Sequence, residues 1–138
     1  MTTSAQKRLP GLTANVDKTI LVLEKDEYLA SLLHFLLNRE GFRINIITDP
    51  GAAILHIENE VPADLIFMNE EWLRHKGLRL LPILRNYPGW NAVPIISLMQ
   101  HYRQNEIDRE MHQGITDYLL QPFEPGDLLD HIQKYTMH

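Results

Sequence analysis

The sequence predicts one α/β domain, a doubly wound parallel sheet of five strands with helices on both faces. From residue 19 onward, short β-branched and aliphatic runs alternate strictly with segments of helical period. The first run is apolar throughout, as expected of a strand that is buried on both faces. The links between successive elements are short, which favours a (βα)5 arrangement with strand order 2-1-3-4-5.

The first strand is expected at residues 19–23 and the first helix at residues 27–40. Gly41 follows this helix and supplies the stop that a helix C-terminus favours. The leucines of the helix recur at helical spacing and are expected on one side of it: Leu29, Leu32, Leu33, Leu36 and Leu37.

The second strand is expected at residues 42–47, and the second helix runs from Asp49-Pro50 to about residue 60. Asp49 suits the N-cap of this helix, and Pro50 suits its first turn. Three strands and three helices follow in alternation, the strands at residues 65–68, 94–98 and 118–120 and the helices at residues 78–86, 104–113 and 125–135. A loop through Gly77 leads into the third helix, and Gly114 closes the fourth.

Length and composition are those of a soluble globular protein. The 138 residues suffice for one buried core, expected at residues 18–138 after a polar N-terminal tail at residues 1–17. No apolar run approaches the roughly 18 to 20 residues that cross a bilayer. The net charge of −5, with scattered Lys and Arg, argues against nucleic-acid binding. The sequence has no cysteine, which excludes disulfides and thiolate metal sites and fits a cytoplasmic protein.

Polar residues follow the predicted strands at the edge where such a sheet binds ligands. Doubly wound sheets bind beyond the carboxyl ends of their strands, at the switch point between strands one and three. The residues expected at this edge are Glu24, Lys25 and Asp26 after strand one, Asn69, Glu70 and Glu71 after strand three, Met99 and Gln100 after strand four, and Gln121 and Pro122 after strand five. Of these, Asp26, Glu70 and Glu71 are expected to be ordinary loop acids.

Four segments resemble motifs of the response regulator receiver domain, a member of the CheY-like superfamily with a flavodoxin-like fold. They are the strand-one run with its acidic end at residues 20–27, the strand at residues 64–69, the strand at residues 94–98, and the closing segment Gly-Ile-Thr-Asp-Tyr-Leu-Leu-Gln-Pro-Phe at residues 114–123. The resemblance covers about residues 18 to 135. The spacing between the pocket positions also resembles that of compact family members without a gap.

The resemblance implies phosphoryl transfer from a histidine kinase to an aspartate, assisted by Mg²⁺, a hydroxyl group and a lysine. This sequence departs from that pattern at four positions. Asn69 stands at the phosphoacceptor, Lys25 at a metal-binding aspartate, Met99 at the hydroxyl residue and Gln121 at the lysine. Only Glu24 keeps its acidic character. The chain is therefore identified as a degenerate pseudo-receiver that lacks the phosphoacceptor aspartate.

The magnesium site is expected to be lost, and no other cofactor or metal is expected. Mg²⁺ usually needs one or two carboxylates among its oxygen ligands, and Glu24 alone supplies too few of them. An ammonium group about 4 Å from a divalent ion would add roughly 8 kcal/mol of repulsion at an effective dielectric near 20. The site is therefore expected to be empty of metal unless Lys25 swings out to solvent. One hypothesis is that Lys25 lies in the pocket and pairs with Glu24 as an internal cation. The alternative is that Lys25 is a solvated surface residue.

Receivers signal through a face made of helix four, strand five and helix five. Tyr118 occupies the aromatic switch position of that face, but Met99 offers no hydroxyl group for it to follow. Asp117 and Asp127 resemble two acids of a salt-bridge set through which one transcription-factor subfamily dimerises. His131 stands where that set needs an arginine. A homodimer through this face is therefore kept as an alternative that the histidine argues against.

Two smaller expectations concern the loops. Gln121-Pro122 is expected to keep the cis peptide of the family's Lys-Pro segment, because that bond shapes a turn. Trp72 and Trp90 lie in predicted loops, where they either anchor a partner or pack on their own domain.

The expected function is that of a stand-alone, non-enzymatic receiver-like module. It would act in two-component (phosphorelay) signalling independently of phosphorylation, by binding an unknown kinase, effector or regulator. Two alternatives stay open. One is a genuine phosphorelay receiver with a displaced acceptor, and the other is a small-molecule-binding flavodoxin-like domain, although the turns after strands one and three lack a glycine cluster.

Overall fold

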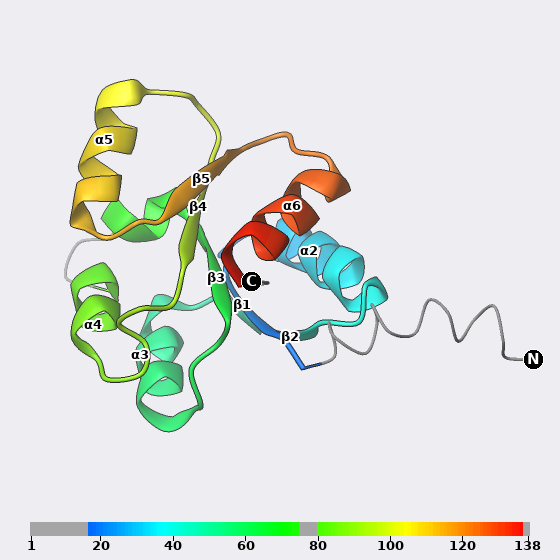
Figure 1. Cartoon of the computed structure of the whole chain (residues 1–138), viewed down its shortest axis with the longest axis horizontal. Coiled ribbons are helices and arrows are strands. Elements are labelled where there is room, and N and C mark those ends of the chain that lie inside the picture. Colours follow the sequence, from blue (N-terminus) through cyan, green and yellow to red (C-terminus); the bar gives the residue numbers. More distant parts are fainter. Residues whose placement is uncertain (1–16, 75–79, 137–138) are drawn as a thin grey trace, which may run out of the picture.

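The computed structural model describes residues 17–74 and 80–136, which form a five-stranded parallel sheet with helices on both faces (Figure 1). The strand order is β2-β1-β3-β4-β5, so the predicted fold class and order are confirmed. The strands are β1 Thr19–Leu23, β2 Arg43–Ile47, β3 Leu65–Asn69, β4 Ile95–Met99 and β5 Asp117–Leu120. Each neighbouring pair runs parallel, and the three central strands are almost wholly buried.

The helices divide between the two faces of the sheet. They are α2 Glu27–Arg39, α3 Pro50–Asn59, α4 Leu80–Asn86, α5 Gln104–Gln113 and α6 Pro125–Thr136, with a short 3-10 helix, η1, at Glu70–Arg74. Buried residues of α2 and α6 pack on one face, and buried residues of α3 and α4 pack on the other. Figure 1 shows α5 on the same side as α3 and α4. No helix among the described residues is long and apolar enough to cross a membrane.

Local signals explain where α2 and α3 begin. Asp26 caps α2, and its carboxylate accepts from the backbone N–H groups of Tyr28 and Leu29. Asp49 caps α3 in the same manner by accepting from Ala52 N–H, and Pro50 follows as the first helical residue. The single apolar side predicted for α2 is only partly correct. Leu33 and Leu37 are buried, whereas Leu32 is 44% exposed.

The segment after β3 differs from the prediction. A loop was expected there, but η1 begins directly after the strand. Its start is set by an Asx-type contact in which Glu71 N–H donates to Asn69 Oδ1 at 2.8 Å. Trp72 lies on this turn and is 1% exposed, as is Trp90. Both rings pack into the core cluster beneath α3 and α4, which favours packing on their own domain over the partner-anchor alternative.

Residues 75–79, including Gly77, lie outside the described residues, as does the expected tail up to residue 16. Helix α4 is therefore described only from Leu80. The predicted limits of the other helices and strands agree with the structure to within one residue. The Gln121–Pro122 peptide bond is cis, as predicted.

Arg85 joins three segments on the α4 side of the sheet. Its guanidinium donates to Gly114 O through Nε at 2.9 Å and Nη2 at 2.7 Å. Nη1 donates to Val93 O at 2.8 Å and Asn91 O at 3.1 Å. Burial lowers the pKa of Arg85. The side chain thereby fixes the turn into β4 and the turn into β5 against the end of α4.

Candidate functional site

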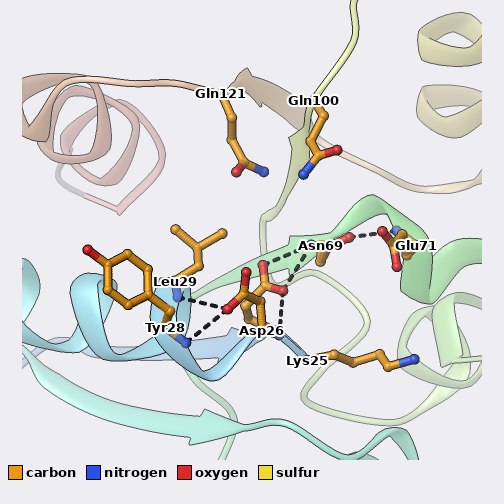
Figure 2. Close-up of a pocket in the computed structure, with 9 residues that line it drawn as sticks. Lys25, Asp26, Tyr28, Leu29, Asn69, Glu71, Gln100 and Gln121 are labelled. Carbon is orange, nitrogen blue, oxygen red and sulfur yellow. Dashed lines mark hydrogen bonds between the residues drawn. The ribbon is translucent and has the colours of Figure 1, made fainter.

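A cavity of about 490 Å³ opens at the carboxyl edge of the sheet, between the ends of β1 and β3 and those of β4 and β5 (Figure 2). Its lower wall comes from the link between β1 and α2 and from the end of β3, and its opposite wall is made by the amide side chains of Gln100 and Gln121. Tyr28 and Leu29, in the first turn of α2, complete the rim. This is the edge at which a doubly wound sheet binds its ligands.

The centre of the cavity is a contact between Glu24 and Asn69. Asn69 Nδ2 lies 2.9 Å from both Glu24 Oε1 and Glu24 Oε2, to which it donates. Asp26 N–H donates to Glu24 Oε2 at 3.0 Å. The Glu24 side chain is only 1% exposed, yet it lines the cavity. The amide of Asn69 thus donates to both oxygens of Glu24, the one acidic residue that this chain keeps at the family's metal-binding positions.

Lys25 does not pair with Glu24, and this hypothesis is corrected by the structure. Lys25 is exposed, and Figure 2 shows its side chain running away from the carboxylates at the cavity centre. The hydrogen bonds to Glu24 come from Asn69 and from the backbone instead. A solvated ammonium keeps its hydration, whereas burial beside Glu24 would remove it. The alternative of a surface lysine at the cavity rim therefore describes the structure.

Met99 is buried in the core, whereas Gln121 lines the cavity. Met99 is the last residue of β4 and fully buried, and it does not line the cavity. Gln121 does line it, and its Nε2 is buried without a hydrogen-bond partner among the described residues. Gln100, the residue after Met99, forms part of the wall in its place. Of the five residues at the receiver family's pocket positions, the structure brings Glu24, Lys25, Asn69 and Gln121 to one cavity.

Asp26 and Glu71 also line the cavity, although sequence reasoning treats them as ordinary loop acids. Tyr28 and Leu29 carry no sequence signal for this role beyond their position one turn after a short β1–α2 link. Within residues 17–74 and 80–136, no group of three or more His, Asp or Glu side chains is arranged to hold a metal ion.

The acids of the expected switch face are engaged within the chain. Asp117 accepts a hydrogen bond from Tyr135 Oη and from Tyr118 N–H, and Lys134 Nζ lies 3.9 Å from its Oδ2. Asp127 Oδ2 accepts from the N–H of Glu124 at 2.8 Å and so closes the start of α6.

His131 is held at the same face. Its Nε2 lies 3.8 Å from Asp117 Oδ2 and 3.2 Å from Tyr118 O, and its Nδ1 lies 2.8 Å from Asp127 O. The side chains expected to make a dimer thus have partners on β5 and α6 of their own chain. Tyr118 is half-buried and packs edge-on against Tyr102, with ring centroids 6.2 Å apart.

Sequence comparison links the chain to known signalling proteins. A family model described as the response regulator receiver domain matches residues 20–133. An uncharacterized 14.6 kDa protein from Leptolyngbya boryana is 27% identical over 118 residues, which cover 86% of this chain and 89% of that protein. The phosphate regulon transcriptional regulatory protein PhoB of Rhizobium meliloti is 29% identical over 114 residues. That match covers 83% of this chain and 50% of PhoB, so the chain spans about half of PhoB's length.

Solved structures share the fold at lower sequence identity. Chemotaxis protein CheY4 of Vibrio cholerae superposes with a TM-score of 0.77 at 18% identity, covering 86% of this chain and 98% of CheY4. The receiver domain of sensor histidine kinase PA1611 from Pseudomonas aeruginosa has a TM-score of 0.72 at 24% identity, covering 88% and 98% of the two chains. At these identities the likeness shows the fold.

Proposed function

The chain belongs to the response regulator receiver domain family, and we propose that it works in two-component signalling without being phosphorylated, by binding another protein of its pathway. The observation that carries the proposal is the contact of Asn69 with Glu24. A carboxamide has no anionic oxygen with which to attack a phosphoryl group. In this chain it also donates to both oxygens of the neighbouring acid, so that acid is already engaged.

The metal requirement supports the same proposal. The PA1611 receiver is described with a magnesium ion coordinated in its active-site cleft. Mg²⁺ needs near-octahedral oxygen ligands, usually including one or two carboxylates. In this chain Glu24 is held by an amide and a backbone N–H, and Lys25 stands at the cavity rim. The engagement of Glu24 disfavours a magnesium ion at this position, whereas the Lys25 side chain points away from the carboxylates and adds little repulsion.

The surface near β5 offers an area for protein binding. Tyr102, Met111 and Leu120 are 55%, 42% and 39% exposed, and they lie just before α5, on α5 and at the end of β5. Apolar side chains on this surface favour contact with a partner such as a kinase or an effector. Because Asp117 and Asp127 are engaged within the chain, a partner is favoured here over the acidic dimer contacts.

The proposal is tested by incubating the chain with acetyl phosphate and Mg²⁺ and measuring its intact mass. No phosphoryl adduct is expected, while a catalytically competent receiver treated in parallel gains one. A gain of one phosphoryl group would reject the proposal and favour a displaced acceptor. Asp26→Asn and Glu71→Gln variants would then show whether one of the two cavity acids other than Glu24 carries the group.

A further inference from the structure

Glu24 is a buried carboxylate, and none of the side chains that the structure describes places a cation beside it. Its side chain is 1% exposed, and its hydrogen bonds come from a neutral amide and a backbone N–H. Lys25 is the basic residue on the cavity wall, and its side chain points away from the carboxylates (Figure 2). Buried charges in proteins are normally paired, because removing a charge from water without compensation is unfavourable. Among the described side chains, the negative charge at the base of the cavity therefore has no matching cation.

The rest of the wall adds to that charge. Asp26 and Glu71 line the same cavity, so three carboxylates face it against one ammonium group at its rim. Oε1 of Glu24 accepts one hydrogen bond, from Asn69, which leaves an acceptor site on a carboxylate oxygen. Asp26 uses Oδ1 for both bonds that cap α2, which leaves its second oxygen available.

The opposite wall and the rim of the cavity suit a planar cationic group at the end of an aliphatic side chain. The side chains of Gln100 and Gln121 lie across the cavity from the acids (Figure 2). Each amide carries an NH₂ donor and an oxygen acceptor, so rotation of the amide by 180° can turn its oxygen toward a bound cation. Tyr28 is 84% exposed at the rim, where its ring can lie against an aliphatic stem or a guanidinium. The volume of about 490 Å³ holds a group of side-chain size.

We propose that this cavity receives an arginine side chain from the protein partner, whose guanidinium pairs with Glu24. The inference rests on the proposed function, because it names the group by which a protein partner is held in the receiver pocket. Guanidinium fits better than ammonium, since it is weakly hydrated and donates in several directions within one plane. The arginine supplies the positive charge that Glu24 lacks within the described part of the chain.

The test is an NMR titration of the full chain with Nα-acetyl-arginine methylamide. The signals to follow are the side-chain NH₂ of Asn69 and the backbone N–H of Asp26, because both donate to Glu24. Saturable shifts of these signals are expected with the arginine probe and not with its citrulline counterpart, which has the same shape without the charge. Equal shifts with both probes, or none with arginine, would overturn the inference.

Three variants assign the effect to the cavity. Glu24→Gln is expected to weaken arginine binding about tenfold or more, because it removes a buried charge from the pair. Glu27→Gln is the matched control, since Glu27 is an exposed acid of α2 outside this cavity, and it should change affinity by less than about twofold. Lys25→Gln should strengthen binding by about two- to threefold, because a competing charge leaves the rim.

Equal weakening by Glu24→Gln and Glu27→Gln would reject the assignment. If Glu24→Gln lost the dispersed spectrum of a folded protein, the test would rest on Lys25→Gln. Unchanged or weaker arginine binding by Lys25→Gln would count against the inference. Mg²⁺ alone is titrated in a separate arm, and displacement of arginine by Mg²⁺ would identify a metal site instead. The mass measurement with acetyl phosphate is independent, so a lack of arginine binding without phosphoryl uptake rejects this inference and leaves the proposed function standing.

Discussion

Asn69 Nδ2 lies 2.9 Å from each carboxylate oxygen of Glu24, and this contact joins the end of β3 to the end of β1. The same amide accepts from Glu71 N–H through its Oδ1, so both ends of one side chain are used. Asn69 is therefore a structural connector between the two strands that meet at the switch point of the sheet. A carboxylate in its place could accept from Glu71 but could not donate to Glu24.

Asn69→Asp is expected to destabilise the protein by roughly 2–4 kcal/mol, because Glu24 loses a donor and gains a like charge beside it. The loss should shrink as the pH falls and the two facing carboxyl groups share a proton. Urea unfolding at pH 7 and pH 5 measures both effects. Asn45→Asp on the exposed side of β2 is the control and should change stability little. A neutral or stabilising effect of Asn69→Asp would show that the connector contributes nothing.

Restoring the magnesium site should require two substitutions. Asn69→Asp alone leaves Lys25 at the rim, whereas the Lys25→Asp, Asn69→Asp double variant adds two carboxylates to those of Glu24, Asp26 and Glu71 around the cavity. The double variant is expected to bind Mg²⁺ about tenfold or more tightly than Asn69→Asp, as measured by isothermal titration calorimetry. Asn69→Asp alone is also expected not to restore phosphorylation by acetyl phosphate. Equal Mg²⁺ affinity in the two variants would mean that Lys25 has no influence on the cavity.

Gly114 is expected to tolerate no side chain. Its φ is +123°, and an added Cβ would lie 2.9 Å from Arg85 Cγ, a side chain held by four hydrogen bonds. Gly114→Ala should therefore cost roughly 1–3 kcal/mol through backbone strain and displacement of Arg85. Gly126→Ala is the matched control, because its Cβ would meet nothing within 4 Å and it lies on α6.

Urea unfolding compares the two glycine variants. Gly126→Ala is expected to be neutral or to stabilise by up to about 1 kcal/mol, since alanine favours a helix. Similar effects of the two substitutions would contradict the role assigned to the Gly114 turn. An Arg85→Ala, Gly114→Ala double variant separates the causes, because the steric part of the loss disappears when the arginine is removed.

The sequence predicted the fold because its signals are local and agree with one another. Asp49-Pro50 and Gly114 mark helix ends through a capping carboxylate, a proline suited to the first turn and a glycine backbone, and apolar runs mark the buried strands. The 3-10 turn at Glu70–Arg74 was missed because it depends on Asn69 Oδ1 accepting from a backbone N–H, which periodicity does not detect. The exposure of Leu32 was missed because helical spacing defines a stripe but not its width.

The sequence predicted which residues lie near the cavity but not the directions in which their side chains point. Topology brought Glu24, Asn69 and Gln121 to one cavity, since the carboxyl ends of parallel strands share an edge. It could not decide where Lys25 points, because a long flexible side chain chooses between an ion pair and water by small differences in free energy. Of the two residues expected after β4, Gln100 lies at the cavity, whereas strand alternation turns the Met99 side chain into the protein.

Tyr135 should make stability fall at high pH. Burial, its hydrogen bond to Asp117 and the charge of Asp117 together raise the pKa of Tyr135 to about 12 from its ordinary value of 10.0. In the unfolded chain the phenol ionises near pH 10, so the folded state keeps its proton over a range in which the unfolded state has lost it. The contribution of Tyr135 is thus complete below pH 10 and is lost as the pH rises through about 12.

The stability difference between the wild-type chain and Tyr135→Phe should accordingly diminish between pH 10 and pH 12, as measured by urea unfolding at each pH. Absorbance at 295 nm gives a second readout, because subtracting the titration of Tyr135→Phe from that of the wild type isolates one late-ionising phenol. Tyr28→Phe is the control, since Tyr28 is 84% exposed. The stability difference between the wild type and Tyr28→Phe should stay constant between pH 10 and pH 12. A constant difference for Tyr135→Phe would show that the contact with Asp117 does not hold the phenol in its neutral form.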